Sequence, residues 1–173
     1  MTAVRILGAV LILCGSAGFG FRAARQLKRT ISQLQMLDTA MHLMDCELSF
    51  VSPPLPRLLR TVSKDTQGPV SQLFSNYAKV ISDPQTKDTE AAMRKAMEMT
   101  KHLSLPPGTV FSLLEFSQTL GRYDLNGQLS AIASVRRRLS PQLDRLKEEQ
   151  KDRCRTYQTL GICAGLAVVI LIV

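Results

Sequence analysis

The side chains able to perform acid–base, nucleophilic or metal chemistry are few in this sequence and lie far apart. His42 and His102 are the two histidines, and the four cysteines form no CxxC pair. Two of the thiols, Cys14 and Cys163, lie inside strongly apolar segments. This spacing provides neither a metal-ligand set nor a disulfide framework, and it is typical of small thiols in a reducing cytosol. We therefore expect no metal and no cofactor.

Catalytic motifs are also absent from the sequence. No GxxxxGK[ST], GxGxxG, HExxH or GxSxG pattern occurs, so neither a phosphate-binding loop nor a zinc-protease helix nor a hydrolase nucleophile turn is predicted. The densest carboxylates alternate with basic residues, as on a solvated helix face, and are Asp144, Glu148, Glu149 and Asp152. Because acid–base groups that could converge on a pocket are so scarce, the sequence predicts a protein that is not an enzyme.

Three consecutive arginines, Arg136, Arg137 and Arg138, are the candidate basic face. They could contact phosphates, but no aromatic residues are interleaved with them and no helix-turn-helix pattern precedes them. Nucleic-acid binding is therefore not expected. Because they lie beside the apolar residues Val135 and Leu139, they fit either a solvated helix face or a face that binds a protein partner.

The net charge of +8 is distributed in a way that indicates a membrane. Every charged residue except Arg5 lies between Arg22 and Arg155, and basic residues crowd the inner flank of an apolar segment at each end of the chain. By the positive-inside tendency, we expect transmembrane helices at 4–21 and 157–173, a cytoplasmic domain at 22–156, and both termini outside. The alternative function from charge alone is a basic membrane-tethered module that binds nucleic acid or anionic lipid.

Each apolar segment also has an alternative interpretation. The first could be a signal peptide, but four basic residues follow it within eight positions, which favours a retained membrane helix. The second contains fifteen residues without a charge, whereas a span requires roughly 20. A half-inserted tail or a helix-packing segment is therefore the alternative to a full span there.

The sequence between the apolar segments predicts an all-α domain of six helices. Apolar residues recur in steps of three and four from Leu27 to Leu48, so the first helix should continue unbroken to about Phe50. Four shorter helices are expected at about 53–63, 69–81, 89–102 and 110–120. The long last helix carries an apolar seam of Leu129, Ile132, Val135, Leu139, Leu143 and Leu146. The first and last helices should be antiparallel because both point at the membrane.

Particular residues are expected to mark helix ends or core positions. Ser52 should cap the second helix, Gly121 should end the fifth, and Asp124 should cap the last. Phe111 is expected to face the core from the fifth helix.

Two stretches of the sequence resemble a known family. In HLMDCELSFVSPPLPRLLRTV (42–62) a helix ends in a Glu-hydrophobic pair and a proline-Leu turn opens the next helix. LGRYDLNGQ (120–128) carries an LGxxD…Q pattern and is the more specific of the two. Together with the apolar ends, they resemble the stage III sporulation protein AB family of endospore-forming bacteria over essentially the whole chain.

The resemblance implies a domain similar to the cytoplasmic six-helix domain of F-type platform proteins in type II secretion and type IV pilus machines. It implies a non-catalytic membrane component of the mother-cell-to-forespore channel, required for endospore formation and located in the outer forespore membrane of the mother cell. The expected partners are the cognate secretion-type sporulation ATPase, other channel membrane subunits and membrane lipid. Platform proteins usually carry two such domains, so this one-domain chain is expected to form a homodimer or to work beside another membrane protein.

Eight positions match the family motifs and are candidate partner contacts. Because they lie at helix junctions, each also has a structural interpretation as a helix stop, a cap or a bundle contact. They are Glu47, Pro54, Leu55, Leu120, Gly121, Asp124, Gly127 and Gln128.

Overall fold

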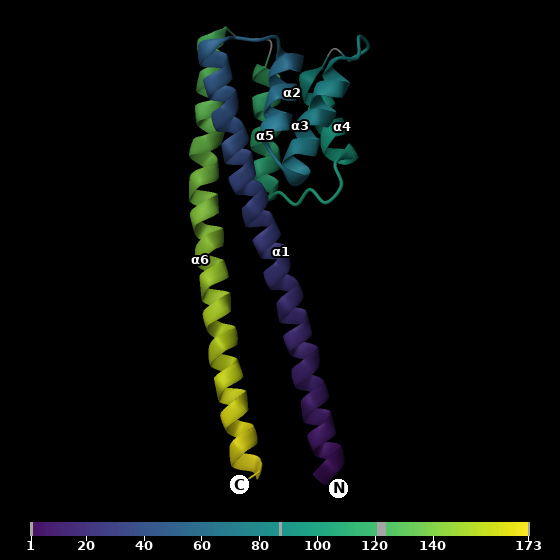
Figure 1. Ribbon diagram of the computed structural model, residues 1–173, viewed down its shortest axis with the longest axis vertical. Coiled ribbons are helices and arrows are strands. Elements are labelled where there is room, and N and C mark those ends of the chain that lie inside the picture. The colour runs from purple at the N-terminus through teal and green to yellow at the C-terminus, as the bar shows by residue number, and fades with distance from the viewer. Residues whose placement is uncertain (1, 87, 121–123, 173) are drawn as a thin grey trace. The chain divides into compact units, whose positions relative to one another are not determined.

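The chain folds into helices, which confirms the all-α class predicted from the sequence (Figure 1). The computed structural model describes the backbone of residues 2–86, 88–120 and 124–172, and the side chains of 25–86, 88–120 and 124–152. The helices of the described backbone are α1 (Thr2–Phe50), α2 (Leu55–Asp65), α3 (Gly68–Ile81), α4 (Thr89–Met99), α5 (Pro107–Thr119) and α6 (Leu125–Ile172).

Two compact units make up the chain. One comprises Thr30–Asp144, and the other comprises Met1–Arg29 together with Arg145–Val173. Among the described residues, no helix combines the length and the apolar composition that crossing a membrane requires. The segments 4–21 and 157–173, which the sequence predicts to be transmembrane, lie outside the described side chains.

The part of α1 that belongs to the Thr30–Asp144 unit presents its predicted apolar stripe to the core. Complete burial of a leucine or methionine side chain is worth roughly 1.5–3 kcal/mol, so a continuous stripe stabilises the bundle strongly. The helix ends at Phe50, as predicted. The buried stripe consists of Ile31, Leu34, Leu37, Met41, Met44 and Leu48.

Ser52 terminates α1 rather than capping α2, so the expectation for this residue is wrong. Its φ of 46° is in the left-handed region, and its backbone N–H donates to the carbonyl of Glu47. Its hydroxyl donates to the carbonyl of Leu48 at 2.8 Å. These bonds occupy carbonyls that the end of α1 leaves free, while Pro54 takes the position before α2.

Helices α2 to α5 pack in chain order, with α2 against α3, α3 against α4, and α4 against α5. Proline lies in the first turn of α2, α3 and α5, where its missing N–H would have no partner in the helix. The N-terminus of α4 is capped differently, because the Asp88 side chain accepts a hydrogen bond from the Glu90 N–H at 3.0 Å. The largest side chains buried between these helices are Tyr77, Phe74 and Phe116.

Within the Thr30–Asp144 unit, α1 and α6 lie in contact and run in opposite directions, as predicted (Figure 1). The predicted seam of α6 is buried at Ile132, Val135, Leu139 and Leu143. Helix α5 is also antiparallel to α6, since its early residue Thr109 bonds Gln142 and its later residue Glu115 pairs with Arg138.

Several helix boundaries and one side-chain orientation differ from the sequence predictions, and α2 lies about two residues later than expected. Helix α4 ends at Met99 and α5 begins at Pro107, each about three residues earlier than expected. Phe111 is 66% exposed, so the prediction that it faces the core is wrong. The core-facing side of α5 carries Leu113 and Phe116 together with hydroxyl groups, and Ser112 and Ser117 are buried there. They donate to carbonyls of their own helix, which removes the cost of burying them.

Candidate partner-binding site

The first motif stretch lies at the junction of α1 and α2. Glu47 is half-buried in the last turn of α1, and its carbonyl accepts the N–H groups of Val51 and Ser52. Its side chain makes no hydrogen bond or ion pair with the described residues. Pro54 is exposed, and its carbonyl accepts from the first turn of α2, where Leu55 is half-buried. This stretch therefore shapes the turn through its backbone.

The second motif stretch joins α5 to α6. Leu120 is fully buried directly after α5, and Gly121 lies outside the described residues. Asp124 caps α6 as predicted, since its Oδ1 accepts the Gly127 N–H at 3.1 Å. Its carbonyl accepts the N–H of Gln128 at 3.1 Å. Asp124, Gly127 and Gln128 thus form the first turn of α6.

The two motif stretches gather at one end of the bundle, where α1 ends and α6 begins (Figure 1). Exposed apolar residues accompany them: Phe50 is 87% exposed, Val51 is 64% exposed and Leu125 is 39% exposed. The prediction that the motif residues lie at helix junctions is confirmed for the described ones, whereas their partner contacts stay predictions.

Two of the three candidate arginines connect α6 to neighbouring helices. Arg136 donates from Nε to Oδ1 of Asp38 on α1 at 3.2 Å, and Arg138 donates from Nη1 to Oε2 of Glu115 on α5 at 2.6 Å. Arg137 is exposed and has no hydrogen-bond or ion-pair partner among the described residues. The basic face is therefore partly neutralised by the bundle itself, and Arg137 is its unneutralised member.

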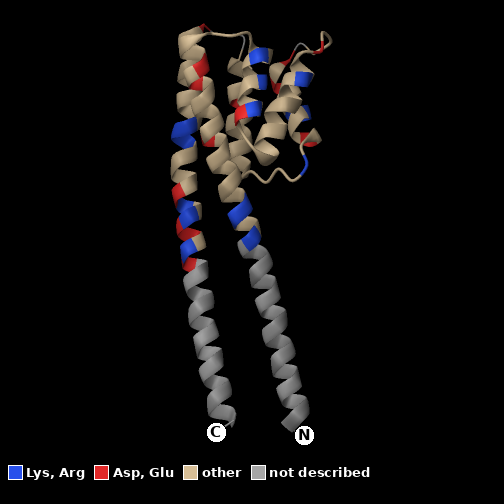
Figure 2. Cartoon of the chain, viewed as in Figure 1, with Lys and Arg blue, Asp and Glu red and all other residues tan. Residues whose placement is uncertain are grey.

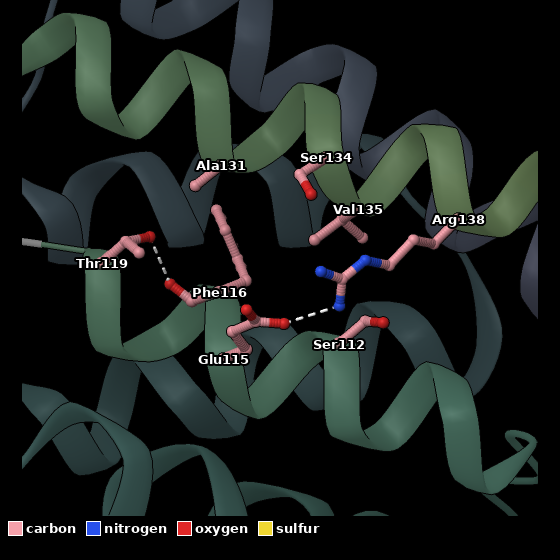
Figure 3. Close-up of a pocket in the computed structure, with 8 residues that line it drawn as sticks. All are labelled: Ser112, Glu115, Phe116, Thr119, Ala131, Ser134, Val135 and Arg138. Atoms are coloured by element: carbon pink, nitrogen blue, oxygen red, sulfur yellow. Dashed lines mark hydrogen bonds and ion pairs between the residues drawn. The ribbon is translucent and has the colours of Figure 1, made fainter.

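A cavity of about 130 Å³ lies between α5 and α6, beside the Arg138–Glu115 pair. Figure 3 shows Phe116 extending from α5 toward Ala131 and Val135 of α6, with Arg138 reaching across to Glu115. Phe116 and Val135 are almost completely buried, whereas the two charged side chains are about half exposed. The α5–α6 cavity is lined by Ser112, Glu115, Phe116, Thr119, Ala131, Ser134, Val135 and Arg138.

Sequence reasoning missed this cavity, although its residues carry a signal. The lining positions on each helix follow the spacing i, i+3, i+4, i+7 of one helix face. On α6 two of the four are small, Ala131 and Ser134, where a packed seam would place larger side chains. Small residues opposite Phe116 leave space that the core does not fill.

The described side chains form no cluster of potential metal ligands. His42 Nε2 and Cys46 Sγ lie 4.0 Å apart on one face of α1, but no third ligand joins them. In the part of the chain with described side chains, no group of three or more His, Cys, Asp or Glu residues could hold an ion.

Charge is nearly balanced over the Thr30–Asp144 unit. This unit contains twelve basic and eleven acidic residues, whereas the other unit contains ten basic and three acidic residues. Figure 2 shows both signs of charge interspersed on the helices of the Thr30–Asp144 unit. Most of the +8 net charge therefore belongs to the two ends of the chain.

These features define a protein that is all-helical in its described regular structure and has a small cavity between α5 and α6. The family model described as stage III sporulation protein AB matches residues 5–173, and the chain belongs to that family. Stage III sporulation protein AB of Bacillus subtilis is 26% identical over 172 residues, which cover 98% of this chain and 99% of the relative. A solved structure of stage III sporulation protein AB matches the fold with a TM-score of 0.64 and 22% identity, over 72% of this chain and 98% of that one.

Proposed function

We propose that this sporulation protein is a non-catalytic assembly platform of the mother-cell-to-forespore channel. Its helical domain docks the cognate secretion-type ATPase and other channel subunits from the mother-cell cytoplasm. The segments 4–21 and 157–173 hold it in the outer forespore membrane as a two-pass protein with both termini outside. The domain comprises residues 22–156 and resembles the cytoplasmic six-helix domain of F-type platform proteins.

The observation that carries this proposal is the division of charge between the two units. The Thr30–Asp144 unit has an excess of one basic residue, whereas the other unit has an excess of seven. Each basic residue near an anionic lipid surface contributes roughly 1 kcal/mol of attraction, so the ends of the chain suit a membrane surface. The nearly neutral bundle is suited to protein contacts.

Topology is tested by producing the full chain in non-sporulating cells, where its apolar segments would enter the plasma membrane, and labelling thiols in the intact cells with a membrane-impermeant reagent. Cys46 is half-exposed in the bundle and should react only after the cells are opened. A cysteine placed at Thr2 should react in intact cells. Reaction of Cys46 in intact cells would contradict the cytoplasmic position of the domain.

The platform role is tested by binding of the purified ATPase to the full chain in detergent or nanodiscs. Binding that weakens only modestly in 0.5 M salt is the expected result, because the bundle has an excess of one basic residue and exerts little long-range attraction that salt would screen. No binding at high concentrations of both proteins would refute the ATPase contact.

The alternative function, a membrane-tethered module that binds nucleic acid or anionic lipid, predicts steeply salt-dependent binding. The pairing of Arg136 and Arg138 with Asp38 and Glu115 weighs against nucleic acid, since it reduces the net charge of the arginine triplet to one, and no aromatic residue lies among the arginines to stack on bases. A salt titration with duplex DNA and with phosphatidylglycerol vesicles separates the two ligands. Under the alternative function, charge reversal of Arg136, Arg137 and Arg138 should abolish binding of the DNA or the vesicles. Binding of the ATPase to the same variant is measured in a separate assay.

A further inference from the structure

We propose that the α5–α6 cavity is a docking site for a protein segment that presents an apolar side chain next to a carboxylate. This inference rests on the proposed function, because it specifies where a channel partner docks and what chemistry the partner carries. It is distinct from the motif residues, which lie at the end of the bundle where α1 ends and α6 begins.

The size and floor of the cavity fit one apolar side chain. Its volume is about 130 Å³, and a cavity of roughly 150 Å³ lined by apolar side chains can hold benzene. Phe116 and Val135 provide an apolar floor, and Ala131 is too small to close the space above it. An aromatic or leucine side chain from a partner would complete the packing that this seam lacks.

The rim of the cavity selects for a carboxylate. Arg138 already holds a carboxylate, that of Glu115, and both side chains are about half exposed. Exposed ion pairs of this kind are worth about 0–1 kcal/mol, so a partner carboxylate can replace Glu115 at little cost. Arg137, the next residue along α6, does not line the cavity, but it adds an exposed positive charge with no partner among the described residues. The local charge is therefore positive and complementary to an acidic segment.

Glu115 acts in this arrangement as an internal competitor. Removing its charge while keeping its shape, by Glu115→Gln, frees Arg138 for an incoming carboxylate. An acidic ligand should then bind up to about fivefold more tightly. This factor is the ratio of dissociation constants that corresponds to the free energy of one exposed ion pair. A purely structural Glu115–Arg138 pair gives no such gain, so the direction of this effect separates docking from stability.

The probe is N-acetyl-phenylalanine, which carries an aromatic side chain beside a carboxylate, and its neutral control is N-acetyl-phenylalaninamide. Binding to the full chain in nanodiscs is followed by ligand-observed NMR. We expect the acid to bind more tightly than the amide, and Arg138→Gln should remove this preference. Equal binding of acid and amide would overturn the carboxylate preference and indicate an apolar pocket only.

Occupation of the cavity is tested with a matched pair of variants on α6. Ala131→Leu fills the cavity and should weaken probe binding at least about tenfold, the equivalent of 1.4 kcal/mol. Ala133→Leu makes the same change at an exposed position two residues away and should leave binding unchanged. Equal binding by the two variants overturns the proposal. If Ala131→Leu instead changes the oligomeric state in light scattering, the occupant is a second copy and the proposal is wrong.

Measuring how the ATPase binds to the wild-type chain and to the α6 variants distinguishes failure of this inference from failure of the proposed function. If the wild-type chain binds the ATPase and Ala131→Leu binds it as well as Ala133→Leu does, only the assignment of this site fails. If the wild-type chain does not bind the ATPase, that contact fails, and the probe still decides the cavity. If Ala131→Leu shows no cooperative unfolding transition and is therefore not folded, the proposal is tested with the exposed variants Glu115→Gln and Arg138→Gln.

Discussion

Arg136 of α6 donates a hydrogen bond to Asp38 of α1 at 3.2 Å, although the two residues are 98 positions apart in the sequence. Both side chains are about 40% exposed. The pair connects the two long helices at the edge of the core that their apolar seams form. Because both charges remain partly hydrated, the pair contributes only modestly to the stability of the bundle.

Disrupting this pair should have a small, salt-dependent effect on stability. We expect a coupling free energy of about 0.5 kcal/mol between Arg136→Ala and Asp38→Ala in a double-mutant cycle, because exposed ion pairs gain little over their hydrated charges. The measurement is denaturant unfolding of the four variants, at low salt and at 1 M salt, where the coupling should shrink. The corresponding cycle with Arg137→Ala should give no coupling, and a coupling of several kcal/mol would contradict the exposed character of the pair.

A buried amide joins the α4–α5 connection to α1. Gln33 is 8% exposed, its Nε2 donates to the His102 carbonyl at 2.9 Å, and its Oε1 accepts the Ser104 N–H at 2.7 Å. Gln33→Ala leaves both backbone groups without these partners, so we expect a loss of about 2 kcal/mol in the free energy of unfolding.

The control for this prediction is Gln35→Ala on the same helix, because Gln35 is exposed and the change in helix propensity is identical. It should change the free energy of unfolding by less than about 0.5 kcal/mol. Equal effects of the two substitutions in urea unfolding would show that the amide bonds of Gln33 do not hold the connection.

The buried seams of α1 and α6 were predictable because apolar residues repeat with the period of a helix over many turns, from Ile31 to Leu48 and from Ile132 to Leu143. Phe111 was misplaced because hydrophobicity alone does not reveal that the core-facing side of α5 includes serine residues beside Leu113 and Phe116. Its neighbour Ser112 is buried there, with its hydroxyl bonded to the Gly108 carbonyl. Local hydrogen bonds of this kind depend on backbone geometry that a hydropathy pattern does not contain.

The candidate site was predictable only in part. The charge of the arginine triplet was evident from the sequence, but the partners of Arg136 and Arg138 come from helices far away in the chain. The α5–α6 cavity depends on which small residues face Phe116, and that register follows from tertiary packing. Periodicity therefore predicted the helices, whereas contacts between them decided the site.

The cap of α6 should contribute measurably to stability. Asp124 accepts the Gly127 N–H through its side chain at 3.1 Å, and a carboxylate at this end also interacts favourably with the helix dipole. Asp124→Ala should lower the free energy of unfolding by about 1 kcal/mol, and Asp124→Asn, which keeps the acceptor oxygen, by less. Thermal or urea unfolding measures both. If the asparagine variant were as unstable as the alanine variant, the side-chain hydrogen bond would not be the source of the stabilisation.

Tyr77 makes the stability of the bundle sensitive to alkaline pH. Its side chain is completely buried, and its hydroxyl has no hydrogen-bond partner among the described residues. Burial, and secondarily the negative charge of Asp88, raises the pKa of Tyr77 above its ordinary value of 10.0. Between these two pKa values the folded chain retains a proton that the unfolded chain has lost. The resulting stabilisation is fully present below pH 10 and is lost as the pH rises above it.

The matched variant for this prediction is Tyr77→Phe, which keeps the ring and removes the titrating hydroxyl. The free energy of unfolding of the wild type should fall relative to that of Tyr77→Phe by up to about 1.4 kcal/mol for each pH unit above 10. Below pH 9 the difference between the two proteins should be constant, and Tyr77→Phe should be at least as stable, because a buried hydroxyl without a partner costs about 1–3 kcal/mol. Urea unfolding at pH 8, 9, 10 and 11 provides the comparison. Parallel pH profiles of the two proteins would show that Tyr77 titrates alike in the folded and unfolded chains, and would therefore contradict its assignment as a buried, neutral group.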